Sequence, residues 1–205
     1  AAIYGYENYY EYAANDIYMR RYSDEQRQAF RQNVKEYILP FYIEVQTRYE
    51  EMRDKLSEEQ EEQFLSLRKD PCQPSNEYLC GYIESYGEKM HTTMANLFDR
   101  EAIFYTQSEN AYDTAYTNYS EYCEQPFVYL GNNRQDMVTL VHELGHYAAF
   151  YHFSDATLPY DTCEVHSQGN EWLMLWYLDG KIDPDVYETF LLWRLRGGFE
   201  TVILS

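Results

Sequence analysis

The chain has 205 residues, and 35 Asp and Glu residues against 16 Lys and Arg residues give it a formal net charge of −19. A strongly acidic chain repels the phosphate backbone of nucleic acids, and no cluster of Lys and Arg in the sequence offsets this repulsion. Nucleic acid is therefore excluded as a partner. Hydrophobic residues make up 45% and charged residues 25% of the chain, as in folded globular proteins, so we expect one domain over residues 1–205.

The sequence predicts no membrane span and no cysteine-based zinc site. The longest strongly apolar run, residues 172–178, is far shorter than the stretch of about 18 apolar residues that a spanning helix needs. The four cysteines form no CxxC pair: Cys72, Cys80, Cys123 and Cys163. A disulfide between Cys72 and Cys80 and four reduced thiols both agree with this spacing.

Helical patterns dominate the first half of the chain. Ser23 begins a capping box, and apolar residues then recur at helical spacing as far as residue 52, with Pro40 expected to kink the helix. Ser57 begins a second capping box, which opens a short acidic helix. The apolar spacing over residues 76–100 predicts one further amphipathic helix.

The second half begins with strand-like sequence and returns to helix. Residues 102–131 are rich in Tyr, Thr, Phe and Asn, which favours short strands around a polar turn. Asp183 followed by Pro184 is typical of the start of a helix. The patterns predict strands at 115–119 and 126–130, and helices at 134–153, 164–178 and 184–203.

The helix predicted over 134–153 contains His-Glu-Leu-Gly-His, which is the HExxH pattern. Two histidines four residues apart, here His142 and His146, project from one helical face within reach of one metal ion. Glu143 stands where it can take a proton from a water that the metal activates. A polar helix face that merely contains two histidines is the alternative. The apolar flanks indicate a buried helix instead, and buried imidazoles need a partner.

Catalytic zinc usually takes three protein ligands, so the pattern needs a third. His152 lies at the spacing of the metzincin pattern HExxHxxGxxH, but Ala149 replaces the glycine that breaks the helix there. Glu164, at the start of the next predicted helix, would complete a set of two histidines and one glutamate. Gln168 and Glu171 share its helical stripe, although a glutamate at a helix start is also favoured by the helix dipole alone.

Residues 136–146 followed by 164–171 resemble the oligoendopeptidase F branch of the thimet-oligopeptidase family of zinc metallopeptidases. The resemblance follows most of the chain in order, and its specific part is 126–171. It implies a mainly α fold, with a helical zincin-type catalytic core and a small antiparallel β-sheet beside the HExxH helix. The sheet, expected within 116–131, would pair with the substrate backbone. The single domain would then be a zinc-peptidase catalytic domain, complete or partial.

The resemblance also implies roles for individual residues. Three of them would hold one zinc ion: His142, His146 and Glu164. Glu143 would be the catalytic base. Two residues match positions that support the ligands from behind: Asp136 and Glu171. His166 is the remaining histidine near the site, and it would either touch the substrate or support the site, or be an ordinary residue of a capped helix.

The implied function is that of a zinc-dependent endopeptidase or oligopeptidase that hydrolyses short peptides. Family members are much longer, and the C-terminal helices that carry their carbonyl-holding Tyr and His groups have no counterpart in this sequence. The alternatives are therefore a catalytically silent metal-binding fragment, a peptide-binding module of a longer enzyme, and a metzincin-like protease that uses His152. The family implies a cytoplasmic protein, while a secreted one and the oligomeric state stay open.

Overall fold

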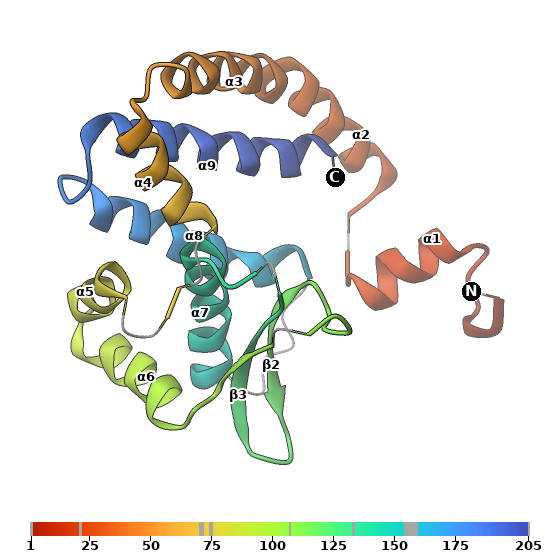
Figure 1. The fold of residues 1–205 in the computed structure, drawn as a ribbon. Coiled ribbons are helices and arrows are strands. Elements are labelled where there is room, and N and C mark those ends of the chain that lie inside the picture. The colour runs from red at the N-terminus through yellow and green to blue at the C-terminus, as the bar shows by residue number, and fades with distance from the viewer. Residues whose placement is uncertain are drawn as a thin grey trace. The chain divides into compact units, whose positions relative to one another are not determined.

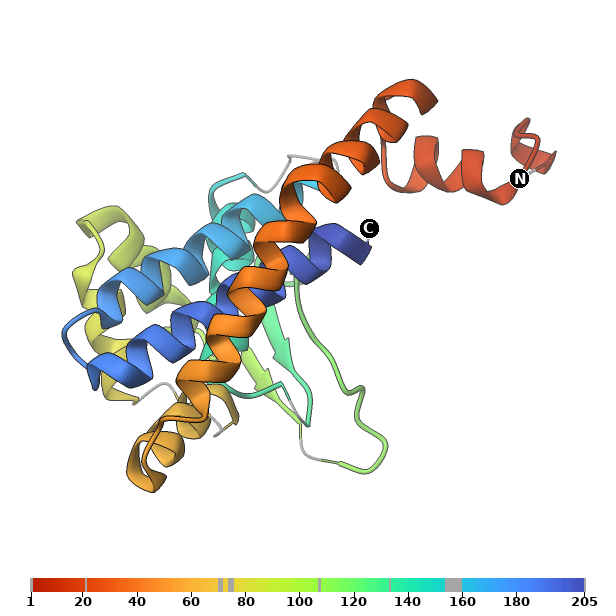
Figure 2. The same cartoon turned by 90° about the horizontal axis from the view of Figure 1, so that it is seen from above.

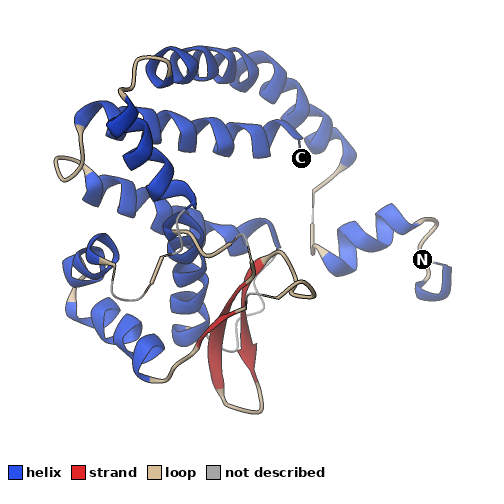
Figure 3. Cartoon of the chain, viewed as in Figure 1, coloured by secondary structure: helices blue, strands red, loops and turns tan. Residues whose placement is uncertain are grey.

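The computed structural model describes residues 2–20, 22–69, 72–73, 76–106, 108–132, 134–153 and 160–204, with backbone alone at 160 and 161. Helices form most of it, together with one small sheet (Figure 3). The chain divides into two compact units. Unit 1 comprises the described parts of Ala1–Phe64, Pro159–Asp161 and Ile182–Ser205, and unit 2 those of Leu65–Leu158 and Thr162–Lys181. That they form one domain stays a prediction.

Unit 1 contains the N-terminal helices and the last helix. Both predicted capping boxes are confirmed, because Ser23 pairs reciprocally with Gln26, and Ser57 with Gln60, through side chain and backbone N–H. The elements of this unit are η1 (Ala2–Tyr4), α1 (Tyr9–Tyr12), η2 (Ala13–Ile17), α2 (Asp24–Asn33), η3 (Val34–Ile38), α3 (Leu39–Arg53), the first part of α4 (Glu58–Lys69) and α9 (Pro184–Leu204).

The disturbance expected at Pro40 takes the form of a π-helical turn. Helices α2 and α3 are joined by η3, in which the hydrogen bonds follow the wider π pattern. Pro40 has no N–H to continue the α-helical ladder, and its ring excludes the carbonyl of Glu36, four residues earlier. One wide turn before the proline accommodates both constraints without ending the helix.

Helices α3 and α9 lie side by side and form the core of unit 1 (Figures 1 and 2). The rings of Phe64 and Phe190 meet edge to face at 6.3 Å between centroids, and both side chains are buried. Asp183 begins α9 as predicted, since its carboxylate accepts the Asp185 and Val186 backbone N–H groups at 2.9 and 3.3 Å.

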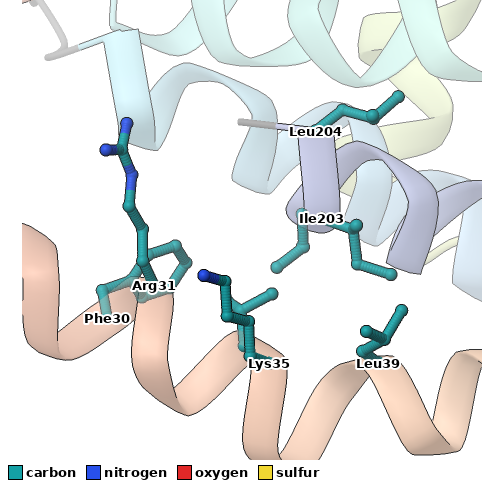
Figure 4. A pocket seen from close by; sticks show the side chains of 8 residues that line it. Phe30, Arg31, Lys35, Leu39, Ile203 and Leu204 are labelled. Carbon is teal, nitrogen blue, oxygen red and sulfur yellow. The ribbon is translucent and has the colours of Figure 1, made fainter.

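A pocket of about 330 Å³ lies in unit 1, between the stretch from α2 to α3 and the end of α9 (Figure 4). Aliphatic side chains and Phe30 form most of its wall, and Arg31 and Lys35 are its charged residues. The described residues that line it include no histidine, cysteine or carboxylate. The pocket therefore lacks the acid, base and metal-binding groups that the sequence leads us to seek.

Unit 2 holds the HExxH helix. Its elements are the end of α4, α5 (Glu77–Ser85), α6 (Glu88–Asp99), β1 (Ile103–Tyr105), β2 (Ala115–Ser120), β3 (Gln125–Leu130), α7 (Met137–His152) and, from Thr162 on, α8 (Tyr160–Leu178). The prediction of one helix over residues 76–100 is wrong. The chain leaves the helix at Tyr86, which is extended, and Gly87 caps α6. Glycine is a weak helix former, and the Tyr86 hydroxyl donates a hydrogen bond to Asn170 on α8.

The sheet has the strand order β1-β3-β2. The antiparallel pair expected from the sequence is confirmed, with Thr117 opposite Val128. The structure adds β1, which pairs with β3 in parallel, so the sheet is mixed. Three residues are too few to show strand alternation in the sequence, which is why β1 was not predicted. Helix α7 packs against β2 and β3, and the Val128 and Leu130 side chains are fully buried.

All four cysteines are free, so Cys72 and Cys80 form no disulfide. Burial raises the pKa of the Cys72 thiol to about 12. No helix in the described part of the chain combines the length and the apolar character needed to cross a bilayer.

Candidate metal centre

Helix α7 presents the two histidines of the HExxH pattern. Asp136 caps it, accepting the Thr139 backbone N–H at 3.0 Å and the Thr139 hydroxyl at 2.8 Å. The apolar side of α7 is buried, with Leu140 and Leu144 fully inaccessible. The contacts of Asp136 are those of a helix cap, and its predicted support of the ligands stays a prediction.

Gly145 allows α8 to approach α7 at the level of the histidines. A Cβ atom at this position would lie 2.5 Å from the His166 carbonyl oxygen and 2.6 Å from the Ser167 Cα. Both neighbours are backbone atoms, which cannot move aside as a side-chain end can. The glycine inside the HExxH sequence therefore sets how closely the two helices pack.

This approach brings the three predicted ligands together. The Glu164 Oε2 atom lies 3.2 Å from His142 Nε2 and 3.5 Å from His146 Nε2. One donor atom from each residue lies within 4.8 Å of the others. Glu164 comes from α8, whereas both histidines come from α7, so the cluster exists only because the helices pack together.

Two further side chains of α8 orient this cluster. Glu171 is 5% exposed, and its Oε1 lies 2.7 Å from His142 Nδ1. A carboxylate there accepts a hydrogen bond from Nδ1–H and so turns Nε2 toward Glu164. Ser167 is fully buried and donates to Glu164 Oε2 at 2.8 Å. The structure thus places Glu171 where the resemblance implied, directly behind a histidine.

Glu143 points to the sheet side of α7. The residue is 4% exposed, and its Oε2 accepts a hydrogen bond from the Thr117 hydroxyl at 2.7 Å. The Thr117 hydroxyl also lies 3.0 Å from the Glu143 backbone carbonyl. Strand β2 therefore fixes one carboxylate oxygen of Glu143.

The other two histidines named from the sequence lie apart from the cluster. His152 Nε2 is 2.9 Å from the Thr93 hydroxyl on α6, whereas Glu164 lies beside His142 and His146. His166 is exposed, and among the described residues no hydrogen bond or ion pair joins its side chain. Its predicted contact with substrate stays a prediction.

The electrostatics of the cluster follow from its geometry. Burial opposes a charge on His142, but hydrogen bonds with Glu164 and Glu171 outweigh it and raise the His142 pKa to about 9. Hydrogen bonds with His142 and His146 hold the Glu164 pKa far below its ordinary value of 4.5. Burial raises the Glu143 pKa, although Thr117 and the histidines oppose this. A positive charge is thus favoured at His142, whereas burial disfavours the charged form of Glu143.

The donor set fits zinc. Two imidazole nitrogens and one carboxylate oxygen are a known catalytic zinc set, and a tetrahedral ion with bonds of about 2.0–2.1 Å separates its ligand atoms by about 3.3 Å. The distances from Glu164 Oε2 to His142 Nε2 and His146 Nε2, 3.2 and 3.5 Å, lie on either side of that value. Glu171 supplies the carboxylate partner that histidine ligands of zinc normally have.

Reasoning from the sequence missed three residues of the site: Thr117, Ser167 and Asn170. Ser167 shares the helical face of Glu164 three residues away, so its spacing could have indicated it. Thr117 lies 26 residues before Glu143, and no local spacing connects them. Asn170 donates to the Val141 carbonyl at 2.7 Å, again across two helices.

Comparison with known proteins relates the fold to peptidases. No family model and no curated protein matches the chain. A structure described as oligoendopeptidase F from Bacillus anthracis str. Ames matches with a TM-score of 0.73 and 20% identity, over 97% of this chain and 39% of that one. PZ peptidase A, solved with an inhibitor, matches with a TM-score of 0.73 and 18% identity, over 97% and 38%.

A second oligoendopeptidase F structure agrees, with a TM-score of 0.64 and 15% identity over 87% of this chain and 34% of that one. The chain therefore spans about two fifths or less of the length of the structures it matches. The resemblance to oligoendopeptidase F noted in the sequence is confirmed at the level of the fold.

Replacing Gly145 with alanine tests the close packing of α7 on α8. We expect Gly145→Ala to lower the free energy of unfolding by about 1–3 kcal/mol, as overpacking does, and to weaken zinc binding because α8 must move. Gly169→Ala is the matched control, since a Cβ there meets nothing within 4 Å. Urea unfolding and zinc titration measure both effects. Equal behaviour of the two variants would contradict the packing argument.

The charged cluster predicts how the stability of the metal-free protein depends on pH. A His142 pKa raised from 6.5 to about 9 stabilises the fold fully below pH 6.5, and this contribution disappears as the pH rises through 9. We therefore expect the unfolding temperature, measured in chelator, to fall between pH 6.5 and 9.5. His142→Gln should flatten this decline, while His91→Gln, on the exposed side of α6, should not. An unchanged slope in His142→Gln would refute the prediction.

Proposed function

We propose that this chain forms the zinc-binding and proton-transfer part of a metallopeptidase that hydrolyses short peptides. The observation that carries the proposal is the convergence of His142, His146 and Glu164 beside Glu143, a buried carboxylate. The likeness of fold to oligoendopeptidase F and PZ peptidase A supports it. Because the chain spans about two fifths of those structures, the activity of a whole enzyme is part of the proposal.

The zinc ion would be held by His142 Nε2, His146 Nε2 and Glu164 Oε2. When bound, it would act as a Lewis acid that polarises the scissile carbonyl and lowers the pKa of water in the site. Glu171 keeps His142 in the tautomer that leaves Nε2 free to coordinate, and Ser167 holds Glu164 Oε2 in place. The chain would thus supply three protein ligands, the number that catalytic zinc sites take from the protein.

Glu143 would be the general base and then the general acid. Thr117 holds its Oε2, so Oε1 remains to accept a proton from the attacking water. The same oxygen would then deliver the proton to the leaving amine. Burial helps this exchange, because the raised Glu143 pKa brings the carboxylate closer to the pH at which it must both take and give a proton.

Strand β2 offers a route for a peptide to reach Glu143. It forms an edge of the described sheet, and an extended peptide can pair with such an edge through backbone hydrogen bonds. Thr117, which contacts Glu143, lies within this strand. A peptide bound along β2 would therefore lie beside the catalytic carboxylate.

Glu143→Gln tests the proposed base. The variant should keep its zinc, because Glu143 is not among the ligands, and lose about 10²- to 10⁴-fold in the rate of hydrolysis. Zinc content and cleavage of an internally quenched peptide measure the two properties. Glu121→Gln, an exposed substitution in the β2–β3 turn, is the control. A Glu143→Gln protein with full activity would rule out the assigned base.

Glu164→Ala and His152→Ala together test the third ligand. Loss of Glu164 should weaken zinc binding by more than about 100-fold, beyond the 10- to 100-fold typical of a residue that only supports a ligand. His152→Ala should leave zinc affinity unchanged, because His152 contacts Thr93 instead. Competition with a chromogenic chelator measures both. The reverse result would favour the metzincin-like arrangement.

A second function has one observation in its favour. The chain spans about two fifths of the peptidases that it resembles, which suits a metal-binding or peptide-binding part without turnover of its own. The peptide assay separates the two proposals. Hydrolysis by the 205-residue chain that chelator abolishes supports the enzyme, whereas zinc binding without hydrolysis supports the silent module.

A further inference from the structure

We propose that Asn170, held by the hydroxyls of Tyr82 and Tyr86, is a positioning residue that aligns α8 with α7 and so sets the geometry of the metal ligands. This inference rests on the proposed zinc site and goes beyond it, because none of the three residues contacts a ligand atom of the cluster. The three side chains, together with the Val141 carbonyl, form what we call the asparagine clamp.

The first part of the clamp joins α8 to α7. Asn170 is 6% exposed, and its Nδ2 donates to the Val141 backbone carbonyl at 2.7 Å. A carbonyl oxygen can only accept, so the amide atom that faces Val141 must be the nitrogen. This fixes the orientation of the amide, and the Oδ1 atom points to the other side.

The second part joins α8 to the α5–α6 region. Tyr82, on α5, lies with its hydroxyl 2.7 Å from Asn170 Oδ1 and 2.9 Å from the Asn170 backbone carbonyl. The Tyr86 hydroxyl, at the end of α5, also contacts Asn170 Oδ1 and the Tyr82 hydroxyl. Two phenol protons are thus available for two acceptors on Asn170. Burial raises the pKa of both phenols, so they keep these protons at neutral pH.

The clamp lies next to the link that holds the first zinc ligand. Asn170 precedes Glu171, and Val141 precedes His142, so the bonds Asn170–Val141 and Glu171–His142 are consecutive bridges between α8 and α7. Glu164 lies seven residues before Glu171, which is about two helical turns on the same face. A small rotation of α8 would therefore displace the supporting carboxylate and the third ligand together.

The hydrogen bonds of the clamp matter for the ligands because they are buried. Removing the Asn170 amide would take from the Val141 carbonyl its partner on α8 and from both phenols their shared acceptor, Oδ1. The Asn170 backbone carbonyl would still accept from Tyr82, so α5 would remain joined to α8 while the side-chain link from α8 to α7 at this level is lost. A zinc site tolerates little movement of α8 against α7, and loss of a supporting contact typically weakens metal binding about 10- to 100-fold.

The experiment compares Asn170→Leu and Tyr86→Phe with wild type in the full chain. Asn170→Leu keeps the number of side-chain heavy atoms and removes every hydrogen bond of the side-chain amide. Tyr86→Phe removes one hydroxyl from a half-buried ring. Thr93→Val is the matched control, because it removes a buried hydroxyl of the same unit that bonds to Lys89 and His152. Each folded variant is measured for its zinc Kd, and for the visible spectrum of the Co²⁺-substituted protein, which reports ligand geometry.

We expect both clamp variants to bind zinc about 10- to 100-fold more weakly than wild type and to shift the Co²⁺ spectrum, while Thr93→Val changes neither. If Asn170→Leu does not fold, Tyr86→Phe decides. If the wild-type protein binds zinc and the clamp variants behave like Thr93→Val, this inference alone is overturned. A wild-type protein that binds no zinc overturns the proposed function and this inference with it.

Discussion

The close contact of α7 and α8 at Gly145 is the constraint on which the candidate site depends. The helix backbones meet where any side chain larger than hydrogen would collide with His166 and Ser167 backbone atoms. Only at that separation can side chains of α8 reach the histidines of α7. Glu164 then lies 3.2 Å from His142 Nε2, and Glu171 lies 2.7 Å from Nδ1 of the same ring.

The cluster also shows how charged groups are accommodated in a partly buried position. Isolated buried charges are costly, so carboxylates and imidazoles gather where each can serve as partner to another. Glu143 is the exception, because its hydrogen-bond donor is the neutral Thr117 hydroxyl rather than a cation in contact. His142 and Glu164 are thereby stabilised as charged groups, whereas burial raises the pKa of Glu143. The pKa values of Glu143 and Glu164 thus shift in opposite directions because their surroundings differ.

Short-range signals in the sequence predicted most of the fold. The capping boxes at Ser23 and Ser57, the strands of the antiparallel pair and the start of α9 all depend on residues within a few positions of one another. The errors arose where another part of the chain intervened. The helix expected over 76–100 breaks at Tyr86, whose hydroxyl binds Asn170 on a distant helix, and β1 exists only because β3 supplies its partner.

The same division holds for the candidate site. The sequence by itself determined His142, Glu143 and His146, because the pitch of one helix fixes their relative placement. It left Glu164 and His152 as rival third ligands, since the choice depends on how a second helix packs. The tertiary structure places Glu164 against both histidines and His152 against Thr93, and this arrangement supports the proposal that Glu164 is the third ligand. The contacts of Thr117 and Asn170 could be found only in the tertiary structure. They join residues 26 and 29 positions apart in the chain, and helical or strand periodicity carries no information over such distances.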